Sequence, residues 1–128
     1  MKNRGNKILL VDDDSRNIFA LSAVLRSRNY ECIAANSIDE AVTALGNDNG
    51  IGIILMDMMM PDMDGYEAIP RIRSLPEGAS IPVISVTAQA MKGDRERCLE
   101  AGADDYLAKP VNVDALDKLL KQYLHQNE

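Results

Sequence analysis

The sequence has few of the residues and patterns that mark a secreted, membrane-embedded or metal-stabilised protein. Among 128 residues there are one histidine and two cysteines. The cysteines, Cys32 and Cys98, form no metal-ligand spacing, which favours reduced and packed thiols. No apolar run reaches the length of a bilayer span, and the opening MKNRGNK lacks the apolar core of a signal peptide. We therefore expect a cytosolic protein with no membrane contact in this chain.

Positive charge is also in deficit. Lysine and arginine total 14 against 20 aspartates and glutamates, for a net charge of −6, and no basic stripe is visible. This pattern argues against a nucleic-acid surface. Hydrophobic residues make up 46% and charged residues 27%, as in ordinary globular proteins. No linker or low-complexity tract divides the chain, so we expect a single domain over residues 1–128 with its core at about 7–124.

Short runs rich in isoleucine, leucine and valine alternate with segments whose apolar residues recur at helical spacing. The expected strands are 7–11, 30–35, 51–56, 82–86 and 105–108. Three of the expected helices are 15–28, 89–101 and 113–124. The second helix of the chain should begin at a capping box formed by Ser37 and Glu40 and end near Gly46. The third helix should be kinked or shortened by Pro70. Parallel strands joined by helical crossovers form an open sheet with helices on both faces. The predicted fold class is therefore a doubly wound α/β sandwich of three layers.

Polar side chains follow four of the predicted strands, at the end where open parallel sheets bind ligands. They are Asp12, Asp13 and Asp14 after the first strand, Asp57 after the third, Thr87 after the fourth and Lys109 after the fifth. In a sheet ordered 2-1-3-4-5 these four strands are neighbours, and their ends converge. Carboxylates held close together need a compensating cation, and Mg²⁺ takes oxygen ligands while keeping waters for a substrate to displace. Asp57 is then placed as a nucleophile that accepts a phosphoryl group.

Four motifs, in their order and spacing, give the chain a resemblance to the receiver domains of two-component response regulators. They are ILLVDDD, ILMDMMMPDMDGYEA, IPVISVTA and AGADDYLAKP, and the resemblance extends from Lys7 to Leu124. It implies a flavodoxin-like (βα)5 fold with a five-stranded parallel sheet, and the order 2-1-3-4-5 used above is part of what it implies. The stretches DDYLAKPVN and MKGDRERCLEAG look like the receivers of hybrid histidine kinases. A stand-alone regulator is the alternative.

Carried over residue by residue, the resemblance implies a magnesium site around the phosphoacceptor. Asp57 would accept the phosphoryl group and would also bind the metal. Asp13 would be a direct metal ligand, and Asp12 would act mainly through water. The remaining protein ligand would be the backbone carbonyl of Met59, so the methionine side chain is not the reason for its position.

The resemblance also implies the groups that hold the phosphoryl group and report on it. Thr87 would bind a phosphoryl oxygen, and Lys109 would pair with the phosphoryl group. Tyr106 matches the switch aromatic of the family, whose ring turns inward when the threonine moves toward the phosphate. Lys109 and Pro110 match a pair joined by a cis peptide, an isomer that is plausible only before proline.

Several conspicuous residues have simpler interpretations. Asp14 is interpreted as the N-cap of the first helix, and Asp62 and Asp64 as turn and cap residues before the third. Methionines 56, 58, 60 and 63 are interpreted as packing residues, because hard oxygen chemistry beside them argues against a soft-metal site. His125 lies in the last turn and is given neither a metal nor a phosphohistidine role.

The functional hypothesis is a signalling switch in a phosphorelay. Asp57 takes a phosphoryl group from a phosphohistidine on a histidine kinase or phosphotransfer domain, and the surface of the fourth helix, fifth strand and fifth helix changes. Such a domain is not an enzyme beyond its own phosphoryl acceptance and loss, and we expect a monomer or a weak phosphorylation-dependent dimer.

Two alternatives stay open. One is a Mg²⁺-dependent phosphohydrolase with an aspartate nucleophile, disfavoured because the nucleophile follows the third strand, the LVDDD run lacks the threonine-bearing motif of those enzymes, and no cap domain is present. The other is a pseudo-receiver that binds partners without phosphorylation, although every residue of the acidic pocket is in place.

Overall fold

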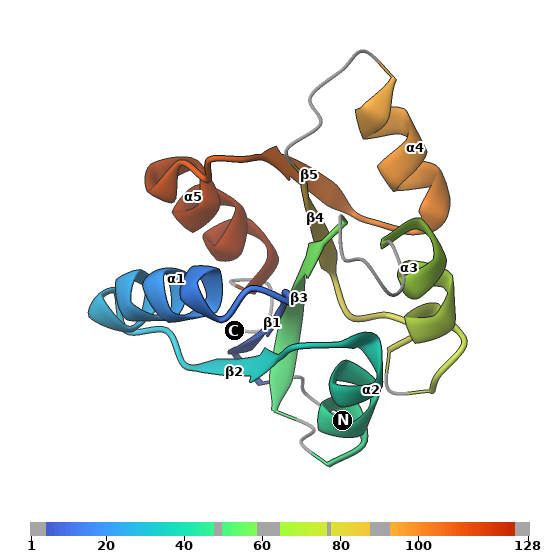
Figure 1. The fold of residues 1–128 in the computed structure, drawn as a ribbon, viewed down its shortest axis with the longest axis horizontal. Coiled ribbons are helices and arrows are strands. Elements are labelled where there is room, and N and C mark those ends of the chain that lie inside the picture. Colours follow the sequence, from blue (N-terminus) through green and yellow to red (C-terminus); the bar gives the residue numbers. More distant parts are fainter. Residues whose placement is uncertain (1–4, 48–49, 59–64, 77, 88–92, 125–128) are drawn as a thin grey trace.

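In the part of the chain that the structure describes, five parallel strands form one sheet and five helices cover its two faces (Figure 1). The computed structural model describes residues 5–47, 50–58, 65–76, 78–87 and 93–124. The strand order is β2-β1-β3-β4-β5, as expected. The strands are β1 (Lys7–Val11), β2 (Cys32–Ala35), β3 (Ile51–Asp57), β4 (Val83–Thr87) and β5 (Asp105–Ala108). The helices are α1 (Ser15–Ser27), α2 (Ile38–Asn47), α3 (Gly65–Arg73), α4 (Asp94–Ala101) and α5 (Val113–Leu124).

The core has two layers, one on each face of the sheet, because successive side chains of a strand point to opposite faces. In β1, Leu9 and Val11 pack with α2, α3 and α4, whereas Ile8 and Leu10 pack with α1 and α5. Strands β3 and β4 are buried along their whole length. This explains why their sequences read as continuous apolar runs rather than alternating ones.

The helix ends follow the predicted capping chemistry. Asp14 is the N-cap of α1, and its carboxylate accepts a hydrogen bond from the backbone N–H of Arg16 at 2.9 Å. Ser37 accepts from the N–H of Glu40 at 3.1 Å, and the Glu40 carboxylate accepts from the N–H of Asn36, one residue before the Ser37 of the predicted box. These contacts set the direction in which α1 and α2 leave the sheet.

Four strand boundaries differ from the predicted ones because backbone hydrogen bonds, not hydrophobicity, decide where a strand runs. One of them is the start of β4, which lies at Val83 rather than at the predicted Pro82. The predicted start of β2 at Tyr30 is wrong, since the N–H of Tyr30 donates to the carbonyl of Leu25 and closes α1 instead. Strands β3 and β4 each extend one residue beyond prediction, to Asp57 and Thr87, and the β3–β4 ladder pairs Asp57 with Val86.

The third and fourth helices need separate comment. Pro70 lies inside α3, which continues beyond it to Arg73. The described part of the fourth helix begins at Asp94, and the start predicted at Gln89 lies outside the described residues. It ends where Gly102 adopts a φ of +117°, a conformation that glycine takes at little cost. Nowhere in the described ranges is a helix long and apolar enough to cross a membrane.

Candidate functional site

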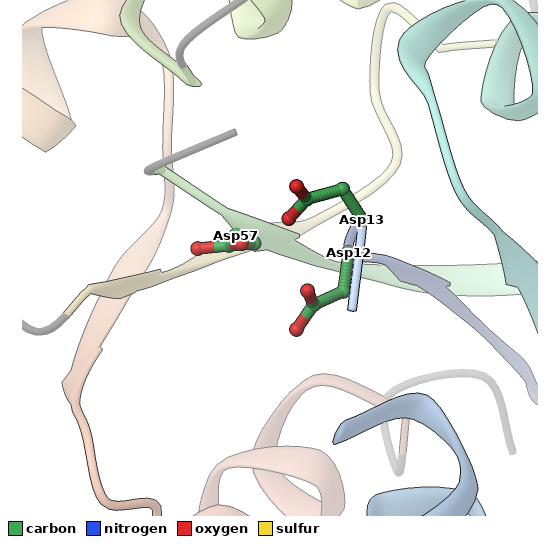
Figure 2. A group of neighbouring side chains, drawn as sticks. All are labelled: Asp12, Asp13 and Asp57. Carbon is green, nitrogen blue, oxygen red and sulfur yellow. The ribbon is translucent and has the colours of Figure 1, made fainter. Parts of the chain in front are cut away.

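Three carboxylates meet at the ends of the two central strands. Asp12 and Asp13 follow β1, and Asp57 is the last residue of β3 (Figure 2). One oxygen atom from each of the three side chains lies within 4.8 Å of the others. Asp57 is buried, Asp12 is half-buried and Asp13 is exposed, so the cluster runs from the interior to the surface. The two acids that follow β1 therefore lie close to the acid at the end of β3, as the sequence predicts.

Asp12 sits between two strands and the first helix. Its backbone N–H donates to the carbonyl of Ala35 at 3.0 Å, and its side chain accepts from the N–H of Asp14 at 2.9 Å. Burial raises the pKa of Asp12 above its ordinary value, and the Asp57 carboxylate adds to this effect. The Asp14 hydrogen bond and the Lys109 charge act in the opposite direction. The carboxylates thus carry an electrostatic cost that a bound cation would relieve.

Lys109 brings a positive charge to the buried acid. Its Nζ atom lies 3.3 Å from the Oδ1 atom of Asp57, whose side chain is 5% exposed. The backbone N–H of Lys109 donates to the carbonyl of Thr87 at 2.8 Å, which ties the end of β5 to the end of β4. The peptide bond between Lys109 and Pro110 is cis, as the resemblance implied.

Thr87 and Tyr106 lie on the neighbouring strands β4 and β5. Thr87 ends β4 and is 1% exposed, and Tyr106 is the second residue of β5. The ring of Tyr106 is half-buried and packs against the core layer beneath α3 and α4. The structure therefore brings together Asp12, Asp13, Asp57, Thr87 and Lys109, with Tyr106 at the adjoining layer.

The donor set fits a small, hard cation. All three side chains offer oxygen, and carboxylates with open positions for water are the ligands that Mg²⁺ prefers. The predicted carbonyl ligand of Met59 lies outside the described residues, as do Met60, Asp62, Met63, Asp64 and His125. Met56 and Met58 are buried in the core layer beneath α2, α3 and α4, which confirms their interpretation as packing residues.

An apolar groove of about 470 Å³ opens beside the site, and the sequence did not predict it. The polar side chains that line the groove are those of Asp12, Asn17 and Lys109. Its walls come from α1 and from the segment that enters α5, and include Ala20, Leu21, Val24, Pro110, Val111 and Val113. Phe19 of α1 is 77% exposed and is not one of the residues that line the groove.

The family model described as the response regulator receiver domain matches residues 8–121. The chain is 45% identical over 116 residues to the sensor histidine kinase RcsC of Salmonella typhi and 40% identical over 116 residues to the histidine-protein kinase BarA of Escherichia coli. Each alignment covers 91% of this chain. The chain spans only 12% of the length of these curated relatives.

Solved structures agree with the sequence relatives. The receiver domain of the sensor histidine kinase PA1611 from Pseudomonas aeruginosa superimposes on this chain with a TM-score of 0.84 at 39% sequence identity. The match covers 94% of this chain and 98% of that one, and the PA1611 structure has a magnesium ion coordinated in its active site cleft. The receiver domain of the Saccharomyces cerevisiae response regulator Ssk1, solved with the histidine phosphotransfer protein Ypd1, gives 0.85 at 27% identity, with 100% and 95% coverage. This chain belongs to the family of response regulator receiver domains.

Proposed function

We propose that this receiver domain is a phosphorylation-activated switch whose phosphoacceptor is Asp57. The observation that carries the proposal is the position of that carboxylate, which is buried at the end of β3, near two further acids and 3.3 Å from the ammonium group of Lys109. A buried acid with a cation at its side and oxygen ligands around it suits nucleophilic attack on phosphorus, which depends mostly on positioning and charge neutralisation.

The transfer forms one bond and breaks one bond. An Asp57 carboxylate oxygen attacks the phosphorus of a phosphohistidine, a P–O bond forms, and the P–N bond breaks. The imidazole nitrogen of the donor keeps the electron pair of the broken bond and becomes neutral or takes a proton from solvent. Asp57 needs no general base, because an ionised carboxylate has no proton to lose. Lys109 and Thr87 are proposed to hold the phosphoryl oxygens.

Asp12, Asp13 and Asp57, with the backbone carbonyl of Met59, are proposed to bind one Mg²⁺ ion. When bound, the ion supplies positive charge against the phosphoryl oxygens and the carboxylates. The presence of magnesium in the cleft of the PA1611 receiver supports this assignment. The oxygen-only donor set supports it independently.

The output is proposed to pass through Thr87 and Tyr106. Thr87 lies at the end of β4, and its carbonyl is bound by the residue that follows β5, so a shift of one strand end moves the other. Tyr106 packs against the layer beneath α3 and α4. The surface formed by α4, β5 and α5 would therefore differ between the free and the phosphorylated protein, provided that contacts differ between the two states.

The phosphodonor is proposed to be a histidine kinase or phosphotransfer domain that packs on the apolar groove beside Asp12 and Lys109. The groove adjoins the acceptor, and Ala20, Leu21 and Val24 give it an apolar wall along α1. A partner that buries this surface would hold its phosphohistidine over Asp57. The complex between Ypd1 and the Ssk1 receiver gives a precedent for a phosphotransfer partner.

The test is phosphorylation of the purified chain by a small phosphodonor, acetyl phosphate, with Mg²⁺. We expect intact-mass spectrometry to show one added phosphoryl group, lost in Asp57→Asn and absent when EDTA replaces Mg²⁺. A mass gain that persists in Asp57→Asn would contradict the assignment. Steady turnover of external phosphate esters would instead favour the hydrolase, and no mass gain with bound Mg²⁺ would favour the pseudo-receiver.

We further propose that residues 1–128 act as one domain in the cytosol, with the core at about 7–124. The expected state is a monomer or a weak dimer that forms on phosphorylation. The similarity to RcsC and BarA supports an origin in a hybrid histidine kinase over a stand-alone regulator.

A further inference from the structure

Ser85 carries a buried hydroxyl group that no other group among the described residues satisfies. It is the central residue of β4, and its side chain is fully buried. In the part of the chain that the structure describes, its Oγ atom has no hydrogen-bond partner. An unpaired hydroxyl in the interior costs free energy, and native proteins keep few of them. This residue therefore raises the free energy of the arrangement described above.

Ser85 has a methionine on one side and a tyrosine on the other. In the sheet register it lies between Met56 of β3 and Tyr106 of β5. Paired residues of parallel strands project to the same face of the sheet, so the hydroxyl lies in the core layer beneath α3 and α4. Met56 is fully buried in that layer and Tyr106 is half-buried against it.

Ser85 also lies within one residue of the acceptor site. The next residue, Val86, pairs with Asp57 in the ladder and accepts the backbone N–H of Met58 at 3.0 Å. Two residues beyond Ser85, on the same face, is Thr87. Strand β4 thus joins the unpaired hydroxyl to the phosphoacceptor through a short stretch of hydrogen-bonded backbone. A displacement of β4 or of the Tyr106 ring changes what Ser85 contacts.

We propose that Ser85 is a positioning residue of the switch, acting through Thr87 and Tyr106. Its hydroxyl is unpaired in the arrangement described here and gains a hydrogen bond in the phosphorylated arrangement, when these neighbours move. The inference rests on the proposed function of Asp57. Ser85→Ala removes the cost of the unpaired hydroxyl from the free arrangement and removes a hydrogen bond from the phosphorylated arrangement. The variant therefore shifts the equilibrium toward the free arrangement.

The test compares stability and ligand binding in Ser85→Ala and in the wild-type chain. Urea unfolding is measured without ligand and with Mg²⁺ plus beryllium fluoride, a phosphoryl analogue that occupies the acceptor carboxylate. Ser85→Cys, with a thiol that is a weak donor but packs well, provides a second variant if alanine perturbs the fold. Ser22→Ala is the matched control, because it removes a buried side-chain hydroxyl on α1, away from β4.

We expect Ser85→Ala to be more stable than wild type without ligand, and to bind beryllium fluoride about three- to tenfold more weakly. Ser22→Ala should leave that affinity unchanged. A change in stability that is equal with and without beryllium fluoride, or a loss of stability without it, would overturn the proposal. If the wild-type chain itself fails to bind beryllium fluoride, or Asp57→Asn still binds it, the proposed function of Asp57 fails instead.

Discussion

Lys109 reaches Asp57 across an intervening strand. Asp57 ends β3 and Lys109 follows β5, and β4 lies between these two strands, yet the Nζ to Oδ1 distance is 3.3 Å. The backbone of Lys109 is fixed to that middle strand through the carbonyl of Thr87. The charge of the buried acid is therefore balanced by a side chain that moves with the edge of the sheet. This arrangement connects the chemistry of the acceptor to the packing of β5.

The first prediction concerns that ion pair. Lys109→Ala leaves the buried Asp57 carboxylate without this cation, and we expect a loss of about 1–3 kcal/mol in the free energy of unfolding when metal is absent. Saturating Mg²⁺ should recover part of the loss, because it supplies positive charge to the same carboxylate. Urea unfolding in EDTA and in Mg²⁺ measures both. Lys121→Ala is the control, since its exposed pair with Asp117 should contribute about 0.5 kcal/mol or less.

The second prediction concerns the raised pKa of Asp12. A carboxyl whose folded-state pKa exceeds its unfolded value gives stability at low pH that is lost as the pH rises through the folded pKa. Without metal at neutral pH, Asp12→Asn should therefore be more stable than wild type. The difference should shrink as the pH falls through the pKa of Asp12, and Mg²⁺ should stabilise the variant less than wild type.

Asp13→Asn separates charge repulsion from metal binding. The Asp13 side chain is exposed, so its removal should change metal-free stability less than Asp12→Asn does, while still weakening Mg²⁺ binding. Calorimetric titration with Mg²⁺ measures the affinity of each variant. Equal Mg²⁺ affinity in wild type and both variants would contradict the proposed metal site.

The strands and the acids at their ends were predictable from local sequence, whereas the strand order that brings these acids together was implied by the resemblance to receiver domains. The apolar run before Asp12 and Asp13 predicts a strand, and the two residues themselves show that acidic side chains follow it. The same holds for Asp57, although its strand includes the acid rather than stopping before it. Hydrogen-bond ladders set such ends, and hydrophobicity does not report them.

Features built from distant segments were not predictable in the same way. The unpaired hydroxyl of Ser85 reads in the sequence as one small polar residue in an apolar strand. Whether that hydroxyl finds a hydrogen-bond partner depends on its neighbours Met56 and Tyr106, which belong to other strands. The groove beside Lys109 likewise needs α1 and the entry to α5 to be placed side by side. Single-sequence periodicity has no information on such pairings.

The third prediction concerns Arg73, another contact that the sequence did not reveal. Its guanidinium pairs with the Asp104 carboxylate at 2.7 Å and donates to the carbonyls of Gly102 and Gly78, so it ties the end of α3 to the turn between α4 and β5. Asp104 also accepts from the N–H of Val83, at the start of β4. Arg73→Ala should cost about 3 kcal/mol of unfolding free energy.

Two variants make the Arg73 result specific. Arg73→Lys should recover little, because one ammonium group cannot reproduce the fork of guanidinium donors. Arg71→Ala removes an exposed pair with Asp39 two residues away and should cost about 1 kcal/mol or less. Similar losses of stability in Arg73→Ala and Arg71→Ala would show that the contact does not bind these segments together.

The fourth prediction is a loss of stability at high pH. The hydroxyl of Tyr30 donates to the Oδ1 atom of Asp117 at 2.7 Å. Burial and this hydrogen bond raise the pKa of Tyr30 to about 12. Because the folded-state pKa exceeds the ordinary value near 10, the contribution is present below about pH 10 and is lost as the pH rises toward 12. In Tyr30→Phe, the free energy of unfolding measured with urea should fall less over this pH range than in wild type. The ultraviolet titration of the variant should show one fewer tyrosine that ionises at high pH.

The fifth prediction separates the docking of a protein donor from the chemistry of the acceptor. Ala20 is exposed and lines the groove, so Ala20→Gln should leave the stability of the chain nearly unchanged. Acetyl phosphate makes no use of the groove and should phosphorylate the variant at the wild-type rate. Transfer from a phosphohistidine protein should slow about tenfold at subsaturating donor, because a polar amide then lies in the apolar groove that the partner is proposed to cover.

Arg26→Ala provides the comparison on the same helix, since Arg26 is exposed and does not line the groove. It should transfer at close to the wild-type rate with either donor. Slower reaction of Ala20→Gln with both donors would place Ala20 in the acceptor chemistry rather than in docking. Unchanged reaction with both would show that the partner approaches Asp57 from another side, because a protein that carries phosphohistidine to this carboxylate along the groove must cover Ala20.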